Sequence, residues 1–190
     1  LATPKLPMKI IVAMDTSLGI GKNGEVPWYL AGDLCRFRRL TTTTEDPAKQ
    51  NAVLMGRRVW ESIPEGKRPL NKRLNVVLST TVSALNFDGS YLVARSFQGA
   101  LDMLNGMSDK IETIWNIGGY RVYEEGLKSP QLYQVGLNSP VIFTSSVSSE
   151  RAKQLKAPRF CNWWSARRES EQLRGLDGKF SFSNYRFFTN

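Results

Sequence analysis

The sequence predicts an α/β fold in a single domain, built on a mainly parallel β-sheet that is flanked by helices. Two observations lead to this prediction. Short, continuous apolar runs have about the length of interior strands, and they alternate along the chain with stretches of helix-like patterning. That alternation is typical of parallel sheets covered on both faces. The chain has 190 residues, of which 41% are hydrophobic, enough for one core and no more than one ordinary domain.

The predicted elements follow one another in a regular order. Buried strands are expected at residues 9–14, 51–55, 74–79, 91–94, 114–117 and 141–145. Helices are expected between them at residues 30–40, 57–62, 97–105 and 120–127. Residues 179–189 differ, because aromatic and polar side chains alternate there, which predicts a late antiparallel strand with one solvated face.

The composition excludes several kinds of chemistry. The chain has no histidine, so nucleophiles activated by histidine are excluded, and with only Cys35 and Cys161 as cysteines no metal site is expected. No apolar run approaches the roughly 20 residues that cross a membrane, and residues 1–9 lack the apolar stretch of a signal peptide. We therefore expect a cytoplasmic protein without membrane contact.

The net charge of +9 favours anionic partners. Such a partner could be a nucleic acid or a phosphorylated nucleotide, and a merely solvated basic surface is the alternative. The best candidate for nucleic-acid contact is residues 163–168, where two tryptophans precede two arginines.

Three glycine-rich turns follow predicted strands. Residues 19–24 spell G-x-G-x-x-G, but residues 26–28 read Val-Pro-Trp instead of opening a helix, which argues against a Rossmann site. This stretch is either an ordinary surface loop or a mobile lid. Gly118-Gly119 and Gly56 each stand between a strand and a helix that carries arginine, an arrangement suited to phosphate. Tight turns and surface charges are the simpler explanations.

Taken together, these stretches resemble the dihydrofolate reductase family. The resemblance runs in the family's order through residues 18–28, Asp33-Leu34 with Phe37, and residues 50–57, 60–64, 68–70, 73–79, 117–119 and Tyr123. It implies an eight-stranded, mostly parallel sheet with a C-terminal antiparallel hairpin, in a domain spanning residues 1–190. Residues 1–8 would be an N-terminal extension, and residues 148–178 match the family poorly.

The resemblance also implies an activity. The family transfers a hydride from NADPH to 7,8-dihydrofolate, giving 5,6,7,8-tetrahydrofolate for one-carbon and thymidylate metabolism, and it binds antifolates. We expect a monomer that needs no nucleic acid. One near alternative is a pyrimidine reductase of the riboflavin pathway, which would not need Asp33, Phe37 and Arg73 together. The other is an inactive relative that serves as an interaction partner.

The family pattern assigns roles residue by residue. Asp33 would be the ionisable group of the pterin pocket, Thr144 would bond it, and Trp28 and Tyr123 would complete the catalytic set. The substrate-binding residues would be Val12, Ala13, Asp33, Leu34, Phe37, Ile63, Leu70, Arg73, Ile117 and Thr144. Within this set, Arg73 would pair with the glutamate α-carboxylate.

The cofactor set is longer. The residues expected to contact NADPH are Ala13, Ile20, Gly21, Gly56, Arg57, Arg58, Val59, Ser62, Leu78, Ser79, Thr80, Ile117, Gly118, Gly119, Tyr120, Arg121, Val122 and Tyr123. Two of the chain's departures from the pattern lie here: Val59 replaces a common threonine, and Asn116 stands where an apolar strand residue is usual. In addition, residues 129–140 are expected to be a connection longer than usual.

Overall fold

The structure is a computed structural model that describes residues 5–15, 20–21, 31–81 and 90–141. All of these belong to one compact unit, Leu1–Ala157, and the second unit, Pro158–Asn190, lies outside the described residues. The boundaries of a single domain over residues 1–190 therefore stay a prediction.

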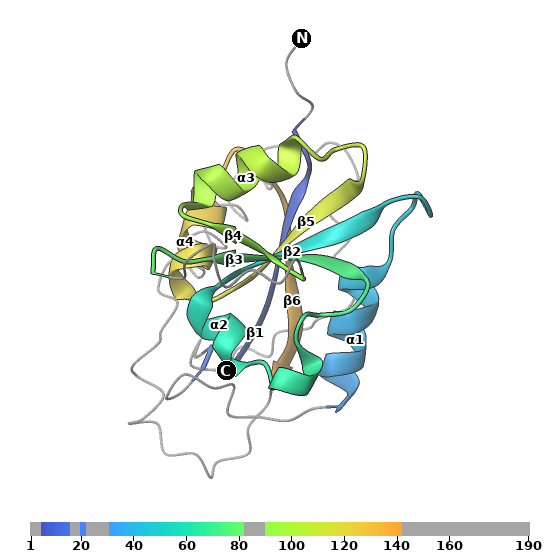
Figure 1. Cartoon of the computed structure of the whole chain (residues 1–190). Coiled ribbons are helices and arrows are strands. Elements are labelled where there is room, and N and C mark those ends of the chain that lie inside the picture. The colour runs from blue at the N-terminus through green and yellow to red at the C-terminus, as the bar shows by residue number, and fades with distance from the viewer. Residues whose placement is uncertain (1–4, 16–19, 22–30, 82–89, 142–190) are drawn as a thin grey trace, which may run out of the picture. The chain divides into compact units, whose positions relative to one another are not determined.

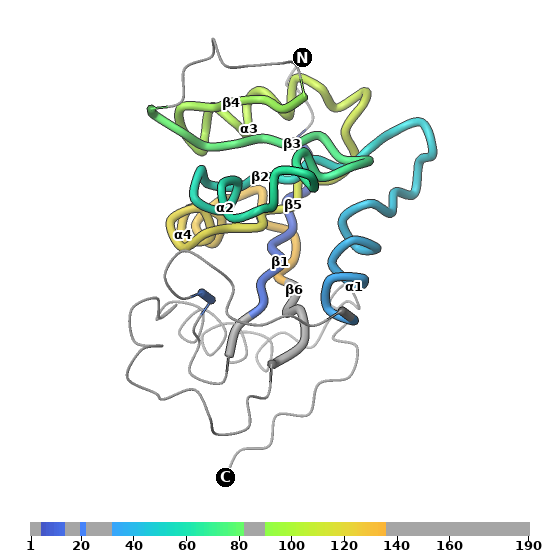
Figure 2. The backbone as a smooth tube through the Cα atoms, turned by 60° about the horizontal axis from the view of Figure 1, so that its bottom comes forward, coloured from blue at the N-terminus to red at the C-terminus, as the bar shows by residue number. Residues whose placement is uncertain are grey.

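The described residues form a six-stranded sheet in the order β4-β3-β2-β5-β1-β6, which Figure 2 shows from one edge to the other. Every pair of neighbouring strands in it is parallel. Its strands are β1 (Met8–Asp15), β2 (Gln50–Gly56), β3 (Arg73–Leu78), β4 (Leu92–Ala94), β5 (Ile111–Gly118) and β6 (Leu132–Val141).

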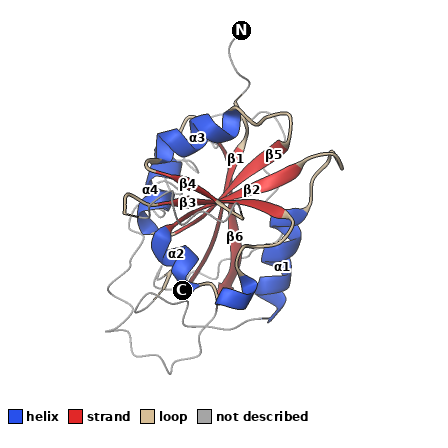
Figure 3. Cartoon of the chain, in the orientation of Figure 1, coloured by secondary structure: helices blue, strands red, loops and turns tan. Residues whose placement is uncertain are grey.

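Helices cover both faces of this sheet, with α1 on the opposite side from α3 and α4 (Figure 3). Their bounds are α1 (Ala31–Thr42), α2 (Arg57–Ser62), α3 (Phe97–Asn105) and α4 (Tyr120–Lys128), with a short 3-10 helix at Glu65–Lys67. Side chains of α1 and α2 pack on one core cluster around Val53 and Val77, and those of α3 and α4 pack on the other around Leu54 and Val76. Both faces of the strands are thus buried, which explains their continuous apolar runs.

The prediction of a parallel α/β sheet flanked by helices is confirmed, and α2 and α3 have the predicted bounds. One prediction was wrong. Residues 132–141 form β6 beside β1, although we expected a connection over residues 129–140. Gln134, Gly136 and Asn138 interrupt the apolar pattern, and Pro140 argues against an interior strand. Of the strand expected at residues 141–145 only Val141, the last residue of β6, is described, and the strand expected at residues 179–189 lies outside the described residues.

The path of the chain marks one position on the sheet as special. β1 and β5 are neighbours, but the helices that follow them, α1 and α4, pack on opposite faces (Figure 1). Ligands of open α/β sheets bind beyond the carboxyl ends of strands at such a switch point. The fold therefore places the site at the carboxyl ends of β1 and β5. Within the described residues, no helix has the length and apolar character needed to span a bilayer.

Candidate active site

One face of α1 connects the two ends of the sheet. Asp33 lies in its first turn, Phe37 follows four residues later and Thr41 four residues after that, a spacing that keeps all three on one helix face. Eight residues of helix rise about 12 Å. Asp33 is near the carboxyl edge of the sheet, whereas Thr41 is next to the first residue of β3.

Arg73, the first residue of β3, closes the far end of this face. Its side chain is only 9% exposed, its Nη1 donates to Thr41 Oγ1 at 2.8 Å, and its Nε donates to the Asn71 carbonyl oxygen at 3.0 Å. The guanidinium carbon lies 5.7 Å from the centroid of the Phe37 ring. Burial, with a smaller contribution from Arg38, lowers the pKa of Arg73 to about 10. Among the described residues no carboxylate forms an ion pair with it.

Asp33 at the near end is also in an environment that disfavours its charge. Burial raises the pKa of the Asp33 carboxyl above its usual value, and the neighbouring Arg36 opposes that shift. Desolvation is the larger of the two effects. An acid with a raised pKa, in the first turn of a helix, is a candidate functional group.

Four of the predicted apolar substrate residues belong to one cluster. Phe37, Ile63, Leu70 and Ile117 pack on the same core cluster as α1 and α2. Leu70 is held in place by Asn75, whose amide both accepts from the Leu70 N–H and donates to its carbonyl oxygen, each at 2.9 Å. Of the other predicted substrate residues, Val12 is buried, Ala13 is half-buried and Leu34 is 48% exposed.

The diglycine turn after β5 has a backbone that only glycine adopts easily. Gly118 has a φ of +99°, and its peptide bond to Gly119 is cis. A Cβ atom on Gly118 would lie 2.6 Å from the ring of Tyr123. Both the positive φ and this close approach therefore require glycine at position 118.

Tyr123 fills the gap where β1 and β5 separate. Their pairing ends at Ile10 and Asn116, and beyond that point the Tyr123 hydroxyl lies 3.0 Å from the Ile11 carbonyl oxygen and 2.9 Å from that of Ile117. The hydroxyl has one proton and donates it to one of the two at a time. Burial raises the pKa of Tyr123 well above its usual value, so the side chain stays neutral.

The starts of α2 and α4 meet at the same edge. A Cβ on Gly56 would lie 3.4 Å from Val122 Cγ2, and one on Gly119 would lie 3.6 Å from Val59 Cγ2. Neither helix has a side-chain hydrogen bond at its N-cap, Gly56 or Gly119. The first N–H groups of a helix have no partner within the helix, so these starts can donate to an anion.

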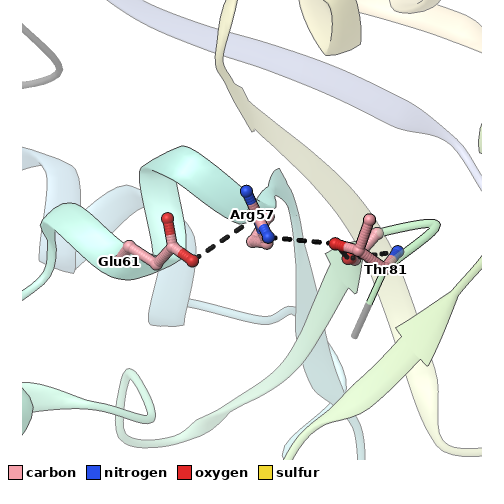
Figure 4. Close-up of polar contacts among 4 residues, drawn as sticks. Arg57, Glu61 and Thr81 are labelled. Atoms are coloured by element: carbon pink, nitrogen blue, oxygen red, sulfur yellow. Dashed lines mark hydrogen bonds and ion pairs between the residues drawn. The ribbon is translucent and has the colours of Figure 1, made fainter. Parts of the chain in front are cut away.

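Arg57, in the first turn of α2, points toward the end of β3 (Figure 4). Its Nη1 donates to Thr81 Oγ1 at 2.9 Å, and its Nε lies 3.4 Å from Glu61 Oε1. The Thr81 N–H donates to Ser79 Oγ at 3.3 Å. Arg95, which follows β4, donates to the Thr80 carbonyl oxygen. The expected phosphate-side residues Arg57, Ser79 and Thr80 therefore lie together.

The remaining predicted cofactor residues are less informative. Arg58, Arg121 and Ser62 are exposed, and Ser62 donates to the Val59 carbonyl oxygen at 2.7 Å. Tyr120, Leu78, Ile20 and Gly21 are half-buried. Trp28 and Thr144, expected in the catalytic set, lie outside the described residues.

Sequence reasoning missed two residues of this region, Thr41 and Arg95. Arg95 could have been found, because it directly follows a predicted strand at the edge where ligands bind. Thr41 stands in a run of four threonines, which gave no sign of the contact with Arg73. Asn116 was noticed as unusual, but its contacts with Val122 and Gly118 are evident only in the structure.

These features define an α/β protein with arginine and two uncapped helix starts at the carboxyl edge of its parallel sheet, and with a buried arginine at the far end of α1. The sequence pattern of the family described as dihydrofolate reductase matches residues 7–140. The chain belongs to the dihydrofolate reductase family, whose members use NADPH to reduce dihydrofolate.

Individual relatives agree with this assignment. The dihydrofolate reductase of Drosophila melanogaster is 41% identical over 130 residues, covering 68% of this chain and 71% of that protein. That of Rattus norvegicus is 40% identical over 127 residues, covering 65% and 67%. A relative from Caenorhabditis elegans, 48% identical, is matched over 65% of its length. The chain thus spans about two thirds of the length of these curated relatives.

A solved structure gives the same result for the fold. The dihydrofolate reductase of Schistosoma mansoni superposes with a TM-score of 0.63 at 32% sequence identity. The match covers 75% of this chain and 82% of that one.

Proposed function

We propose that this chain is an NADPH-dependent dihydrofolate reductase that converts 7,8-dihydrofolate to 5,6,7,8-tetrahydrofolate. Beyond family membership, one observation carries the proposal: a half-buried acid, Asp33, and a buried cation, Arg73, lie at opposite ends of one face of α1. Asp33 and Arg73, by way of Thr41, are separated by about 12 Å of helix, too far to neutralise each other. Dihydrofolate has hydrogen-bond donors at its pterin end and a carboxylate at its glutamate end, so it complements both.

The pterin end binds at Asp33. Its carboxylate accepts hydrogen bonds from the pterin 2-amino group and N3, and Thr144 supports it. Because burial raises the pKa of Asp33, this group can polarise the ring so that a water molecule protonates N5. Trp28, which the family pattern adds to the catalytic set, is outside the described residues, and Val12, Ala13, Leu34 and Ile117 complete the apolar surround.

The tail of the substrate lies along the rest of α1. Phe37, Ile63 and Leu70 grip the aminobenzoyl ring, and Arg73 pairs with the α-carboxylate in a bidentate contact. The 5.7 Å approach of Arg73 to Phe37 supports this arrangement, because it places the cation beside the aromatic grip. A pyrimidine reductase of the riboflavin pathway would not need these two residues and Asp33 together.

The residues at the carboxyl edge fit NADPH. The uncapped starts of α2 and α4 supply N–H donors for the pyrophosphate, and Gly118 lets the backbone approach it. Arg57, with Ser79 and Thr80, faces the phosphate of the adenosine side, and Ala13, Ile20 and Gly21 contact the nicotinamide end. The remaining members of the cofactor set are Gly56, Arg58, Val59, Ser62, Leu78, Ile117, Gly119, Tyr120, Arg121, Val122 and Tyr123. When bound, NADPH supplies the hydride for C6 of the pterin.

The finer features of the fold and setting belong to the same proposal. A sheet of eight strands, completed by a C-terminal antiparallel hairpin that includes residues 179–189, would follow the family architecture. The protein would act as a monomer in the cytoplasm, would bind antifolates in place of dihydrofolate, and would need no nucleic acid.

The test is a spectroscopic assay of NADPH consumption. Purified protein mixed with NADPH and dihydrofolate should cause the absorbance of the reduced nicotinamide to fall, and leaving out dihydrofolate should abolish the fall. The Asp33→Asn variant, prepared identically, controls for a contaminating reductase. If NADPH is not consumed, or if parent and Asp33→Asn preparations consume it equally, the proposed function is wrong.

A further inference from the structure

Asn116 is a fully buried amide in the middle of the sheet, at a position the proposed chemistry does not use. It lies on β5, in register with Ile10 of β1 on one side and Leu54 of β2 on the other. A buried amide without hydrogen bonds costs on the order of 1–3 kcal/mol, so its partners decide whether it is tolerated.

The two ends of this amide bind backbone groups on either side of the turn between β5 and α4. Its Nδ2 donates to the Val122 carbonyl oxygen at 2.7 Å, and its Oδ1 accepts from the Gly118 N–H at 3.1 Å. One side chain therefore links the last residue of β5 to the first turn of α4, across Gly119.

Gly126, one turn further along α4, makes room for the amide. A Cβ atom on Gly126 would lie 2.4 Å from Asn116 Nδ2 and 3.2 Å from Ile10 Cδ1. Glycine inside a helix costs about 1 kcal/mol relative to alanine, so its presence in a nine-residue helix needs a local reason. The contact with Asn116 provides that reason, and the two residues form a matched pair.

We infer that Asn116 is a positioning residue for the cofactor, and that Gly126 exists to accommodate it. The amide fixes the direction of the Gly118 backbone and the distance between β5 and the start of α4. Gly118 and the start of α4 are the backbone groups that bind the pyrophosphate in the proposed function, and this inference rests on that function. Asn116 itself touches neither ligand: it determines where the N–H donors of α4 point.

The experiment compares the affinities for two ligands in Asn116→Ala and Gly126→Ala. Calorimetry would measure NADPH and a methotrexate-like folate analogue separately, and thermal unfolding would be followed for each protein. Because Asn116→Ala loses two backbone contacts, its affinity for NADPH should fall roughly tenfold or more, while its affinity for the folate analogue should change by less than about threefold. Gly126→Ala, the second variant, keeps the amide but displaces it. It should show the same pattern as Asn116→Ala, with a loss of NADPH affinity and little change in the affinity for the folate analogue.

The double variant tests the pairing. With alanine at position 116 there is no amide to displace, so adding Gly126→Ala should not lower the melting temperature further, whereas it should do so in the parent. NADPH affinity should stay as weak as in Asn116→Ala. A drop in melting temperature that is the same in both backgrounds would overturn the pairing of the two residues.

Asn105→Ala is the matched control, because Asn105 is another buried amide but lies near the amino end of the sheet. It accepts from the Leu6 N–H at 2.9 Å and exchanges hydrogen bonds with Gln131. It should lower the melting temperature without a selective loss of NADPH. The parent must first be shown to consume NADPH with dihydrofolate. If Asn116→Ala then lowers the affinities for both ligands alike, or leaves the NADPH affinity unchanged, the positioning role is wrong. If the parent protein consumes no NADPH with dihydrofolate, the proposed function is wrong instead.

Discussion

Replacing Arg73 with leucine should separate ligands that carry a glutamate tail from ligands that do not. Arg73 is 9% exposed and has polar contacts to Thr41 and Asn71, but among the described residues it has no carboxylate partner. Losing one side of a partly desolvated, bidentate contact costs on the order of 2–4 kcal/mol, or about 30- to 1000-fold in affinity. The affinities for dihydrofolate and methotrexate-like ligands should fall by that factor, while small diaminopyrimidines should bind almost as before.

The stability of the same variant distinguishes a binding residue from a structural one. Burial lowers the pKa of Arg73 to about 10, so folding disfavours its charged form. That cost is present at neutral pH and disappears only as the pH rises above the folded-state pKa. Arg73→Leu should therefore leave the melting temperature at pH 7 unchanged or higher.

Calorimetry with one ligand of each kind measures the two affinities, and repeating it at several pH values gives a second test. The affinity of the parent for tail-bearing ligands should be constant from pH 7 to about 9 and fall as the pH passes about 10, where free Arg73 loses its proton. Arg68→Leu is the control, since Arg68 stacks on Trp60 and pairs with Glu65. Equal weakening of both ligands would show damage to the fold. No weakening would place the carboxylate elsewhere, for instance at Arg36, Arg38 or Arg39.

Three further predictions concern the other end of the site. Asp33→Asn should lower kcat at neutral pH by about two to four orders of magnitude. Because burial raises the Asp33 pKa, the ionised form costs stability above the usual value of 3.8, so this variant should melt no lower than the parent at pH 7, with the difference vanishing near pH 3. Turnover within about threefold of the parent would refute the assignment. Arg57→Ala should weaken NADPH far more than NADH, and Glu61→Gln, which frees Arg57 from its 3.4 Å contact, should strengthen NADPH at low salt; equal effects on both nucleotides would make Arg57 structural. Tyr123→Phe should lower the free energy of unfolding by about 1 kcal/mol but leave the pH profile of kcat unchanged, since the hydroxyl is held neutral; a changed profile would give Tyr123 a proton-transfer role.

Most of the fold could be predicted because its strands are buried on both faces. A strand such as β2, buried from Asn51 to Met55, has a continuous apolar run that distinguishes it from the amphipathic helices on either side. β6 could not be recognised in this way. It lies at the edge of the described sheet, where polar residues, glycine and proline are tolerated, so its sequence resembles a loop.

The candidate site divides in the same manner. Residues whose chemistry shows in their type and local context could be proposed from the sequence: an arginine after a strand-ending glycine, or an acid in a first helical turn. Residues that act through packing could not. The contact of Thr41 with Arg73 joins positions 32 residues apart, and Gly126 in a helical stretch indicates only a weaker helix until Asn116 is seen against it.

The charged groups at the two ends of α1, half-buried Asp33 and buried Arg73, differ from the buried amides of the core. Asn105, Gln131 and the Leu6 backbone satisfy one another through four hydrogen bonds, as buried polar groups that serve only the fold should. Asp33 and Arg73 also have interactions within the fold, but burial shifts both of their pKa values against their charged forms. Groups whose pKa values are shifted in this way cluster at functional sites. One ligand can relieve both only if it places donors and a carboxylate about a dozen ångströms apart, across an apolar middle.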